Sequence, residues 1–348
     1  MDLSRIKILQ KGLKNPILIK KKENLLYLTG HSFDYRAEEY LLVKKNDVVG
    51  FGSGLEKITW AKRADRFKNI GKYIPRSQTL ELFGEFTYGE VAYIKFKNPG
   101  LKIKVNVKHS PVDYQRMVKS DEEIRLVGKS MSIVGKVFKQ VKHQLKRKAW
   151  TEEGLAKFIT ETGYKLGAED ISFPAIVAAG ANAAIPHHVP SSRRLKPGES
   201  IIIDFGFKYK NYCSDFTRTV FLKRVQSRLE KAYNQVEKAY AKSIDTAKVG
   251  SKAGDVYQKA VDVLAEKHLD KYFIHSLGHG TGLEIHELPN LSPNSKDILK
   301  ENMVFSIEPG VYIPKLGGIR IEDLVYLGKE GVKKFINVPT DIKENIIV

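Results

Sequence analysis

Cysteine is almost absent from this chain of 348 residues, which contains only Cys213. A single cysteine cannot form an internal disulfide, so the composition excludes a disulfide-stabilised secreted scaffold and favours the reducing cytoplasm. Long apolar runs are also missing, since no stretch of about 18 apolar residues occurs, and this argues against a membrane-spanning helix. The first residues, MDLSRIKILQKGLKN, lack the apolar core and small-residue cleavage site of a signal peptide. We therefore expect a cytoplasmic protein that does not associate with a membrane.

Acidic residues are few relative to basic ones: 40 Asp and Glu against 59 Lys and Arg give a formal net charge of +19. Such an excess is found in proteins that bind nucleic acids or anionic substrates. The motifs that would support nucleic-acid binding are missing from the sequence. It has no basic segment interleaved with aromatics, no zinc-finger spacing and no phosphate-binding glycine loop. The charge is spread along the chain, which favours a lysine-rich solvated surface over a nucleic-acid partner.

What is present is the composition of a globular protein, with 42% apolar and 28% charged residues in a chain long enough for two domains. Residues 1–112 predict a mixed α/β domain. Its strands are expected in segments 16–30, 38–52, 90–97 and 101–108, and a helix is expected over residues 56–68. Pro111 and the polar segment after it mark the boundary, so residues 113–348 are expected to form the second domain.

The second domain is expected to open with two helices. Ser120 and Glu123 have the spacing of a capping box, and apolar residues then recur every three or four positions as far as Leu145. Thr151 is placed to cap a second helix that stops at Gly167. A second pair of helices is expected over residues 228–248 and 254–267.

Residues 201–221, IIIDFGFKYKNYCSDFTRTVF, have the pattern of an antiparallel hairpin, in which two apolar runs flank a polar turn. A four-residue loop at 208–211 would place Asp204 directly opposite Asp215. Opposed side chains on one face have Cβ atoms about 4.5–5.5 Å apart. Two carboxylates at that distance repel each other unless a proton or a cation lies between them. The hairpin therefore indicates a metal site.

A second part of the chain repeats this arrangement. The sequence HHVP at His187 matches HELP at His286, and LKPGESIIID, which ends at Asp204, matches LKENMVFSIE, which ends at Glu308. A second hairpin would place Glu308 opposite Glu322. The chain is therefore expected to contain a duplicated helix-helix-hairpin unit, each copy of which supplies two facing carboxylates.

Four carboxylates that converge on apolar strands would be unstable without cations. Together with an imidazole they form an oxygen-rich donor set that suits two divalent ions about 3.5–4 Å apart. This set accepts Mn, Co, Fe or Zn, and the absence of cysteine donors argues against a structural zinc site. Each acid taken singly could instead be a solvated residue at a strand end, but the symmetric placement of all four favours metal. The expected ligands are Asp204, Asp215, His279, Glu308 and Glu322.

Together these motifs resemble those of the pita-bread metallopeptidases. The segments that carry the resemblance are IIIDFG…CSDFTRT, GHGTGLEIHELP, SIEPGVYIP and GIRIEDLVYL, in the family order across residues 113–348. The subgroup is that of the Xaa-Pro dipeptidases (prolidases) and Xaa-Pro aminopeptidases, related to creatinase and methionine aminopeptidase. Residues 1–112 resemble, less specifically, their creatinase-like N-terminal domain. The resemblance implies an α/β protein whose pita-bread domain has a pseudo-twofold repeat, and it implies a homodimer.

The resemblance also implies roles for individual residues. Asp215 and Glu322 would bridge two divalent metal ions. Asp204 would bind one of these ions, and His279 and Glu308 would bind the other. Outside the ligand set, the residues that the family uses match His187, His286 and Arg320.

This set of residues predicts a peptidase whose nucleophile is a hydroxide ion. A water bridging two dications becomes acidic near neutral pH, and Glu308 would take its proton and return it to the leaving nitrogen. An imidazole of His187 or His286 would stabilise the oxyanion. Arg320 would either clamp the substrate carboxylate or act as a charge partner for the acids. His188 stands where relatives often have an aromatic or small residue, which affects substrate contacts rather than the chemistry.

The resemblance implies that the substrate is an Xaa-Pro dipeptide or short peptide, and the length of the chain, which is about that of compact prolidases, favours a prolidase. An Xaa-Pro aminopeptidase is the alternative within the same chemistry. Creatine-type C–N hydrolysis on this fold dispenses with metal, and non-catalytic binding relatives are expected to have broken metal ligands. The complete donor set argues against both.

Overall fold

The computed structural model describes residues 4–31, 38–52, 61–64, 67–74, 78–84, 86–106 and 109–348. The chain divides into two compact units, Met1–Arg116 and Met117–Val348. The boundary predicted between residues 112 and 113 falls inside helix α4 (Pro111–Met117). Among the described residues, no helix has both the length and the apolar character needed to cross a membrane.

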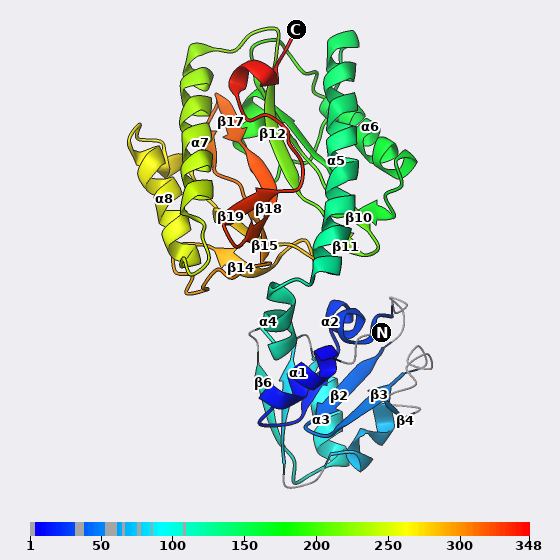
Figure 1. The fold of residues 1–348 in the computed structure, drawn as a ribbon. Helices are drawn as coiled ribbons and strands as arrows, with labels where there is room; N and C mark the ends of the chain where they lie inside the picture. The colour runs from blue at the N-terminus through cyan, green and yellow to red at the C-terminus, as the bar shows by residue number, and fades with distance from the viewer. Residues whose placement is uncertain are drawn as a thin grey trace. The chain divides into compact units, whose positions relative to one another are not determined.

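The first unit is built on a six-stranded mixed sheet with the order β4-β3-β2-β1-β5-β6 (Figure 1). Its strands are β1 (Ile17–Ile19), β2 (Tyr40–Lys44), β3 (Asp47–Phe51), β4 (Lys62–Ala64), β5 (Thr79–Phe83) and β6 (Lys102–Asn106). Its helices are α1 (Ser4–Gly12), α2 (Lys22–Thr29), α3 (Tyr88–Lys97) and the 3₁₀ helix η2 (Phe67–Lys72). Leu42, Leu80 and Ile94 belong to the buried apolar core of this unit.

Two helices of the first unit occupy segments in which the sequence pattern predicted strands. α3 covers residues 90–97 because Thr87 and Glu90 form a capping box, in which each side chain accepts a hydrogen bond from the other residue's backbone N–H. α2 lies within segment 16–30 and ends at Gly30, whose φ of 73° is the left-handed conformation that glycine adopts readily. Strands were therefore wrongly predicted for the residues of these two helices, because a short apolar run does not distinguish a buried helix from a strand.

The helix predicted over residues 56–68 lies mostly outside the described residues. Within the described part, Lys62–Ala64 forms β4, which pairs in parallel with β3, so the helix prediction is wrong for these three residues. Strands β1, β2, β3 and β6 lie in segments 16–30, 38–52 and 101–108, where strands were expected.

The second unit begins with the two predicted helices. α5 (Asp121–Arg147) starts at the capping box of Ser120 and Glu123, and its apolar stripe is buried. The side chain of Thr151 accepts a hydrogen bond from the backbone N–H of Gly154 and caps the next helix. The other helices of the unit are α6 (Glu152–Lys165), α7 (Ser227–Thr246), α8 (Ala253–Ala265), η3 (Gly180–Ala184), η4 (Asp270–Tyr272) and η5 (Ile342–Asn345).

A nine-stranded sheet lies at the centre of the second unit. Seven strands follow the order β14-β13-β15-β18-β12-β9-β8, while β19 pairs with β18 and β20 with β12. On one side of the central β12–β18 pair lie β9 and β8, and on the other lie β15 and β13, with β14 added at that edge. In Figure 1 the long helices α5 and α7 lie to the two sides of these central strands. The predicted helix-helix-hairpin repeat is therefore confirmed. The strands are β8 (Ile176–Ala179), β9 (Ser200–Asp204), β12 (Phe216–Leu222), β13 (Gly278–Gly280), β14 (Glu287–Leu291), β15 (Val304–Ile307), β18 (Glu322–Gly328), β19 (Gly331–Lys334) and β20 (Ile346–Ile347).

Two smaller sheets complete the unit. One is three-stranded, with the order β11-β10-β7, and the other is the two-stranded hairpin β16-β17. Their strands are β7 (Asp170–Ile171), β10 (Phe207–Tyr209), β11 (Tyr212–Cys213), β16 (Gly310–Ile313) and β17 (Gly317–Arg320).

The first hairpin has a tighter turn than the sequence predicted. Lys210 and Asn211 have φ values of 47° and 68°, and these two residues connect β10 to β11 without the expected four-residue loop. Asp204 therefore pairs with Thr217, and the predicted pairing with Asp215 is wrong. The register differs by two residues, and a shift of two preserves which side chains share a face.

The second hairpin has the predicted register. β15 pairs with β18, and β16 pairs with β17, in one continuous alignment that places Glu308 opposite Glu322. Lys315, about which the chain reverses, has a φ of 64°.

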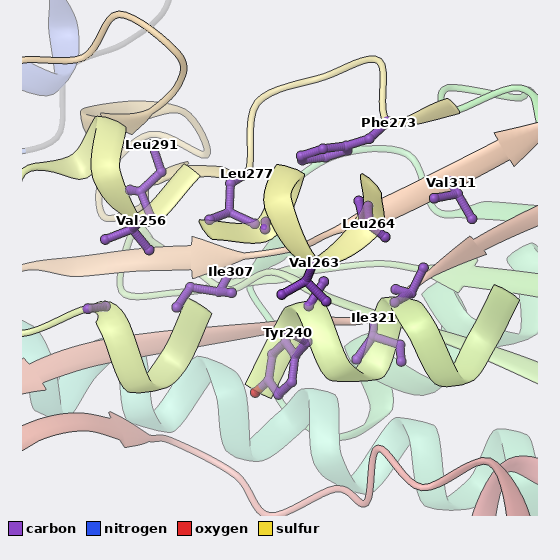
Figure 2. Close-up of a cluster of buried hydrophobic side chains, with 14 of the residues drawn as sticks. Tyr240, Val256, Val263, Leu264, Phe273, Leu277, Leu291, Ile307, Val311 and Ile321 are labelled. Atoms are coloured by element: carbon purple, nitrogen blue, oxygen red, sulfur yellow. The ribbon is translucent and has the colours of Figure 1, made fainter. Parts of the chain in front are cut away.

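The apolar core of the second unit lies between α7, α8 and the sheet. Figure 2 shows part of it, in which Val263 and Leu264 of α8 pack in one buried cluster with Ile307 and Val311 of the sheet region. Full burial of each such aliphatic side chain contributes about 1.5–3 kcal/mol. This core holds β15 and β16 in place, and Glu308 lies between these two strands.

Candidate active site

The five predicted metal ligands come from neighbouring elements of the nine-stranded sheet. Asp204 ends β9, His279 is the middle residue of β13, and Glu322 begins β18. Asp215 lies between β11 and β12, and Glu308 directly follows β15. All five line one cavity of about 550 Å³. The two halves of the second unit thus bring together five residues that are far apart in the sequence. Asp204 and Glu322, the first and last of them, are separated by 118 positions.

His279 lies among the carboxylates with one ring nitrogen turned toward them. Its Nδ1 is 3.1 Å from the carbonyl oxygen of Gly280, to which it donates, so Nε2 faces the acids. Nε2 lies 3.6 Å from Asp215 Oδ2 and 3.3 Å from Glu308 Oε1. One donor atom each from Asp215, His279 and Glu322 lies within 4.8 Å of the other two. This spacing is close to that of donors that share one ion.

A chain of hydrogen bonds connects the remaining carboxylate to this group. Arg320 Nη2 donates to Asp204 Oδ2 (2.5 Å), and Arg320 Nε donates to Thr217 Oγ1 (3.1 Å). Thr217 Oγ1 in turn donates to Glu322 Oε2 (2.6 Å). The corrected register of the first hairpin makes this possible, because it places Thr217 beside both Asp204 and Glu322.

Two carboxylate oxygens of the site are left without a partner. Within the described part of the chain, Asp204 Oδ1 and Glu322 Oε1 are buried and accept no hydrogen bond. Leaving a buried acceptor unsatisfied costs about 1–3 kcal/mol, and more for a charged group. A divalent cation would satisfy both atoms. The residues present therefore fit a metal site.

The electrostatics of the site divide its acids into two groups. Burial raises the pKa of Asp204, Asp215 and Glu322, and for the last two the neighbouring carboxylates raise it further. Burial acts in the same direction on Glu308, but the hydrogen bond and charge of His279 outweigh it and hold the pKa of Glu308 at about 2. Glu308 is therefore ionised throughout the physiological range.

Arg320 is buried, and the structure gives it several partners at once. Besides Asp204 and Thr217, its guanidinium donates to the hydroxyl of Tyr312 (2.7 Å) and the carbonyl of Pro186 (3.4 Å). This arrangement is that of a charge partner for the acids, one of the two roles considered for Arg320.

Two further residues of the cavity, Tyr312 and His275, were not in the predicted set. The Tyr312 hydroxyl lies 2.9 Å from His275 Nε2, and His275 Nδ1 lies 2.6 Å from the carbonyl oxygen of Ser276. Alternation along β16 could have indicated Tyr312, because it lies four positions after Glu308 and side chains alternate along a strand. The sequence contained no signal for His275, since the residues after it form no regular element before β13.

The other predicted catalytic residues, His187 and His286, also line the cavity. The ring of His286 packs edge-on against that of His279, with centroids 4.2 Å apart. Burial and the charge of His279 lower the pKa of His286, which favours its neutral form. The structure thus places all eight predicted site residues on one cavity.

Glycines beside His279 allow the close approach of neighbouring strands. A Cβ atom on Gly278 would lie 2.0 Å from the backbone oxygen of Ser306, and one on Gly280 would lie 2.0 Å from that of Leu288. Both distances are too short for any side chain. These glycines therefore hold β13 tightly between β14 and β15, and Ser306 Oγ accepts a hydrogen bond from the backbone N–H of His279 (3.0 Å).

Comparison with known proteins agrees with this geometry. The profile of metallopeptidase family M24 matches residues 125–329. The Xaa-Pro dipeptidase of Pyrococcus horikoshii is 31% identical over 348 residues, covering 97% of each chain. A putative Xaa-Pro aminopeptidase of Mycoplasma pneumoniae is 33% identical over 327 residues, covering 92% of this chain and 91% of the relative.

A solved structure extends the comparison to the fold. The Xaa-Pro dipeptidase from Bacillus anthracis superposes with a TM-score of 0.89 at 26% identity, covering 99% of both chains. The expected pita-bread fold is confirmed. The protein described here belongs to metallopeptidase family M24.

Proposed function

We propose that this metallopeptidase is a prolidase, an Xaa-Pro dipeptidase that depends on two metal ions. The observation that carries the proposal is the cluster of four acids and one imidazole on a single cavity, with two buried carboxylate oxygens left unpaired. The full-length similarity to proteins named Xaa-Pro dipeptidase supports the choice of substrate.

Five residues would hold two divalent ions in the proposed enzyme: Asp204, Asp215, His279, Glu308 and Glu322. Oxygen-rich sets with one imidazole accept Mn, Co, Fe or Zn. Ions bound here would acidify a water molecule to give the hydroxide nucleophile and would polarise the scissile carbonyl.

The protein's own groups would handle the proton and the developing charge. Glu308 is ionised and held by His279, so it can accept a proton and return it to the leaving nitrogen. An imidazole N–H of His187 or His286 would stabilise the oxyanion, because both side chains line the cavity.

The cavity also suits the proposed substrate. Apolar groups, including Phe173, Pro174 and Ile176, line part of it, and such surface favours a proline ring. The tertiary amide before proline offers no N–H, so recognition must come from the ring and from the charged ends of the dipeptide. Arg320, which is paired with Asp204, would place positive charge at the cavity for the substrate carboxylate.

Substrate length is the first test. The metal-loaded protein is expected to hydrolyse Leu-Pro at least tenfold faster than Leu-Pro-Gly, with both rates measured as kcat/KM by liquid chromatography of the products. Metal content per chain, measured on the same sample, should be close to two ions. Equal rates would remove the preference for a dipeptidase, and faster cleavage of the tripeptide would favour an Xaa-Pro aminopeptidase. The similarity to the Mycoplasma protein makes that activity the second candidate.

The proposed enzyme is a cytoplasmic homodimer. The single cysteine fits a reducing compartment, and the family resemblance implies the dimer. Light scattering of the purified protein should give twice the mass of one chain, and a monomer at micromolar concentration would refute the dimer.

A further inference from the structure

The carboxylate of Glu152 is a buried group that the proposed mechanism does not use. Glu152 is the first residue of α6, and its side chain is 0% exposed. The carboxylate accepts hydrogen bonds from five groups. These donors are the backbone N–H of Ala179 (2.8 Å), the amide of Asn182 (3.0 Å), Nε2 of His188 (2.8 Å), and both the backbone N–H (3.1 Å) and the hydroxyl (2.6 Å) of Ser191.

All five donors belong to one segment, residues 179–191, which we call the wall segment. After η3 the wall segment has no regular secondary structure, so its own backbone hydrogen bonds do little to fix it. Its residues 186–190 line the same cavity as the candidate metal ligands. The carbonyl of Pro186 accepts a hydrogen bond from Arg320 Nη1 (3.4 Å). The wall segment thus carries His187 and contacts the acidic cluster through Arg320.

Glu152 is well suited to hold such a segment. Hydrogen bonds to charged groups contribute about 1.5–3 kcal/mol each, and a carboxylate at a helix N-terminus is further stabilised by the helix dipole. Burial opposes ionisation, but the hydrogen bonds from Ser191 and His188 outweigh it and lower the pKa of Glu152. The ionised carboxylate can accept from all five donors at once.

His188 connects this anchor to the cavity. Its Nε2 lies 2.8 Å from the Glu152 carboxylate, and this contact fixes the ring orientation and leaves Nδ1 as the ring nitrogen outside it. The side chain of His188 is 13% exposed and lines the cavity. A polar atom on a ring of fixed orientation is therefore available at a wall that otherwise includes Val189 and Pro190.

We propose that Glu152 is a positioning residue of the active site, which holds the wall segment and, through His188, sets a polar contact for the substrate. The kinetic part of this inference rests on the proposed function, because it is measured as Xaa-Pro hydrolysis. The structural part does not, because it concerns the wall segment alone.

Glu152→Gln tests the proposal without changing the size of the side chain. A glutamine has one acceptor oxygen and presents an NH₂ group to groups that are themselves donors, so the donors that face the new NH₂ group lose their partner. We expect the KM for Leu-Pro to rise at least tenfold, with a smaller change in kcat and with metal content unchanged. Glu153→Gln is the matched control, because Glu153 is the next residue of the same helix and is exposed. It should leave both constants unchanged.

His188 variants keep the proposal testable if Glu152→Gln does not fold. His188→Ala should raise KM by a similar factor with a small change in melting temperature. His188→Gln, whose amide can donate in place of Nε2–H, should recover part of the loss. A KM that stays within twofold of wild type in both His188→Ala and Glu152→Gln would overturn the proposal, even if the melting temperature fell.

Hydrogen exchange separates this inference from the proposed function. In Glu152→Gln the backbone amides of Ala179 and Ser191, which donate to the carboxylate, should exchange at least tenfold faster than in wild type or Glu153→Gln. Unchanged exchange would overturn the anchoring role. If the wild-type protein does not cleave Xaa-Pro bonds, the proposed function fails, and the exchange result alone decides whether Glu152 holds the wall segment.

Discussion

Replacing Glu308 by glutamine is expected to reduce kcat for Xaa-Pro hydrolysis by about 10²–10⁴-fold, the usual contribution of a general base. The amide keeps the shape of the side chain and one oxygen donor, so the protein should retain at least one metal ion. The amide cannot accept the proton, however, and it loses the ionic contact with His279. Turnover of Leu-Pro and metal content should be measured on the same preparation.

The result depends on two comparisons. Glu301→Gln, which changes an exposed acid seven positions earlier, should have wild-type kcat and metal content. If Glu308→Gln retained wild-type turnover, Glu308 would be excluded as the base. If it lost all metal, the defect would be one of binding, and the role in proton transfer would need another variant.

Removal of metal is the second change with a large expected effect. Chelation should abolish activity and also lower the melting temperature, because buried acids lose their counter-ions and the unpaired oxygens of Asp204 and Glu322 lose their partner. A ligand present at about 1,000 times its Kd stabilises a protein by about 4 kcal/mol. For a domain of this size that corresponds to a decrease of roughly 10 °C, which differential scanning calorimetry would detect. If the metal-free protein had the same melting temperature as the metal-loaded protein, or a higher one, the claim that these acids repel each other without metal would be wrong.

The decrease in melting temperature caused by chelation should become larger as the pH rises. Asp215 and Glu322 have a pKa raised well above the ordinary value. A carboxyl group with a raised pKa in the folded state contributes to stability because folding favours its protonated form. This contribution is complete below the pKa of the group in the unfolded chain, about 4. It is lost as the pH rises through the pKa of the group in the folded protein. Glu308 has a lowered pKa, so its contribution to stability has the opposite pH dependence and is lost only as the pH falls toward 2. Between pH 5 and 8 the melting temperature of the metal-free protein should therefore fall. In the same series, Glu322→Gln should melt higher than metal-free wild type, because one repelling charge is gone.

Local signals in the sequence predicted much of the second unit. Ser120 and Glu123 are three residues apart, and capping needs only that spacing, so the start of α5 could be predicted. The second hairpin was predicted in the correct register because the apolar runs on either side of Lys315 leave one alignment in which the buried faces match.

Local signals gave wrong predictions where the same sequence pattern is compatible with two different local structures. Residues 90–97 contain a short apolar run of the kind found in buried strands, yet Thr87 and Glu90 cap a helix there. In the first hairpin the turn depends on the positive φ of Lys210 and Asn211. Lysine seldom adopts that conformation, so composition alone favoured a longer loop. The error moved the partner of Asp204 from Asp215 to Thr217.

Periodicity along the chain was enough to predict the repeat and the convergence of its four acids: Asp204, Asp215, Glu308 and Glu322. The repulsion of like charges was enough to predict that these acids need positive charge. The neutral and basic groups around them could be identified only from the folded protein. The link from Arg320 through Tyr312 to His275 joins separate elements, and Glu152 holds a segment that begins 27 residues further along the chain. Such contacts depend on how packed elements approach one another in space, and no spacing along the chain records that.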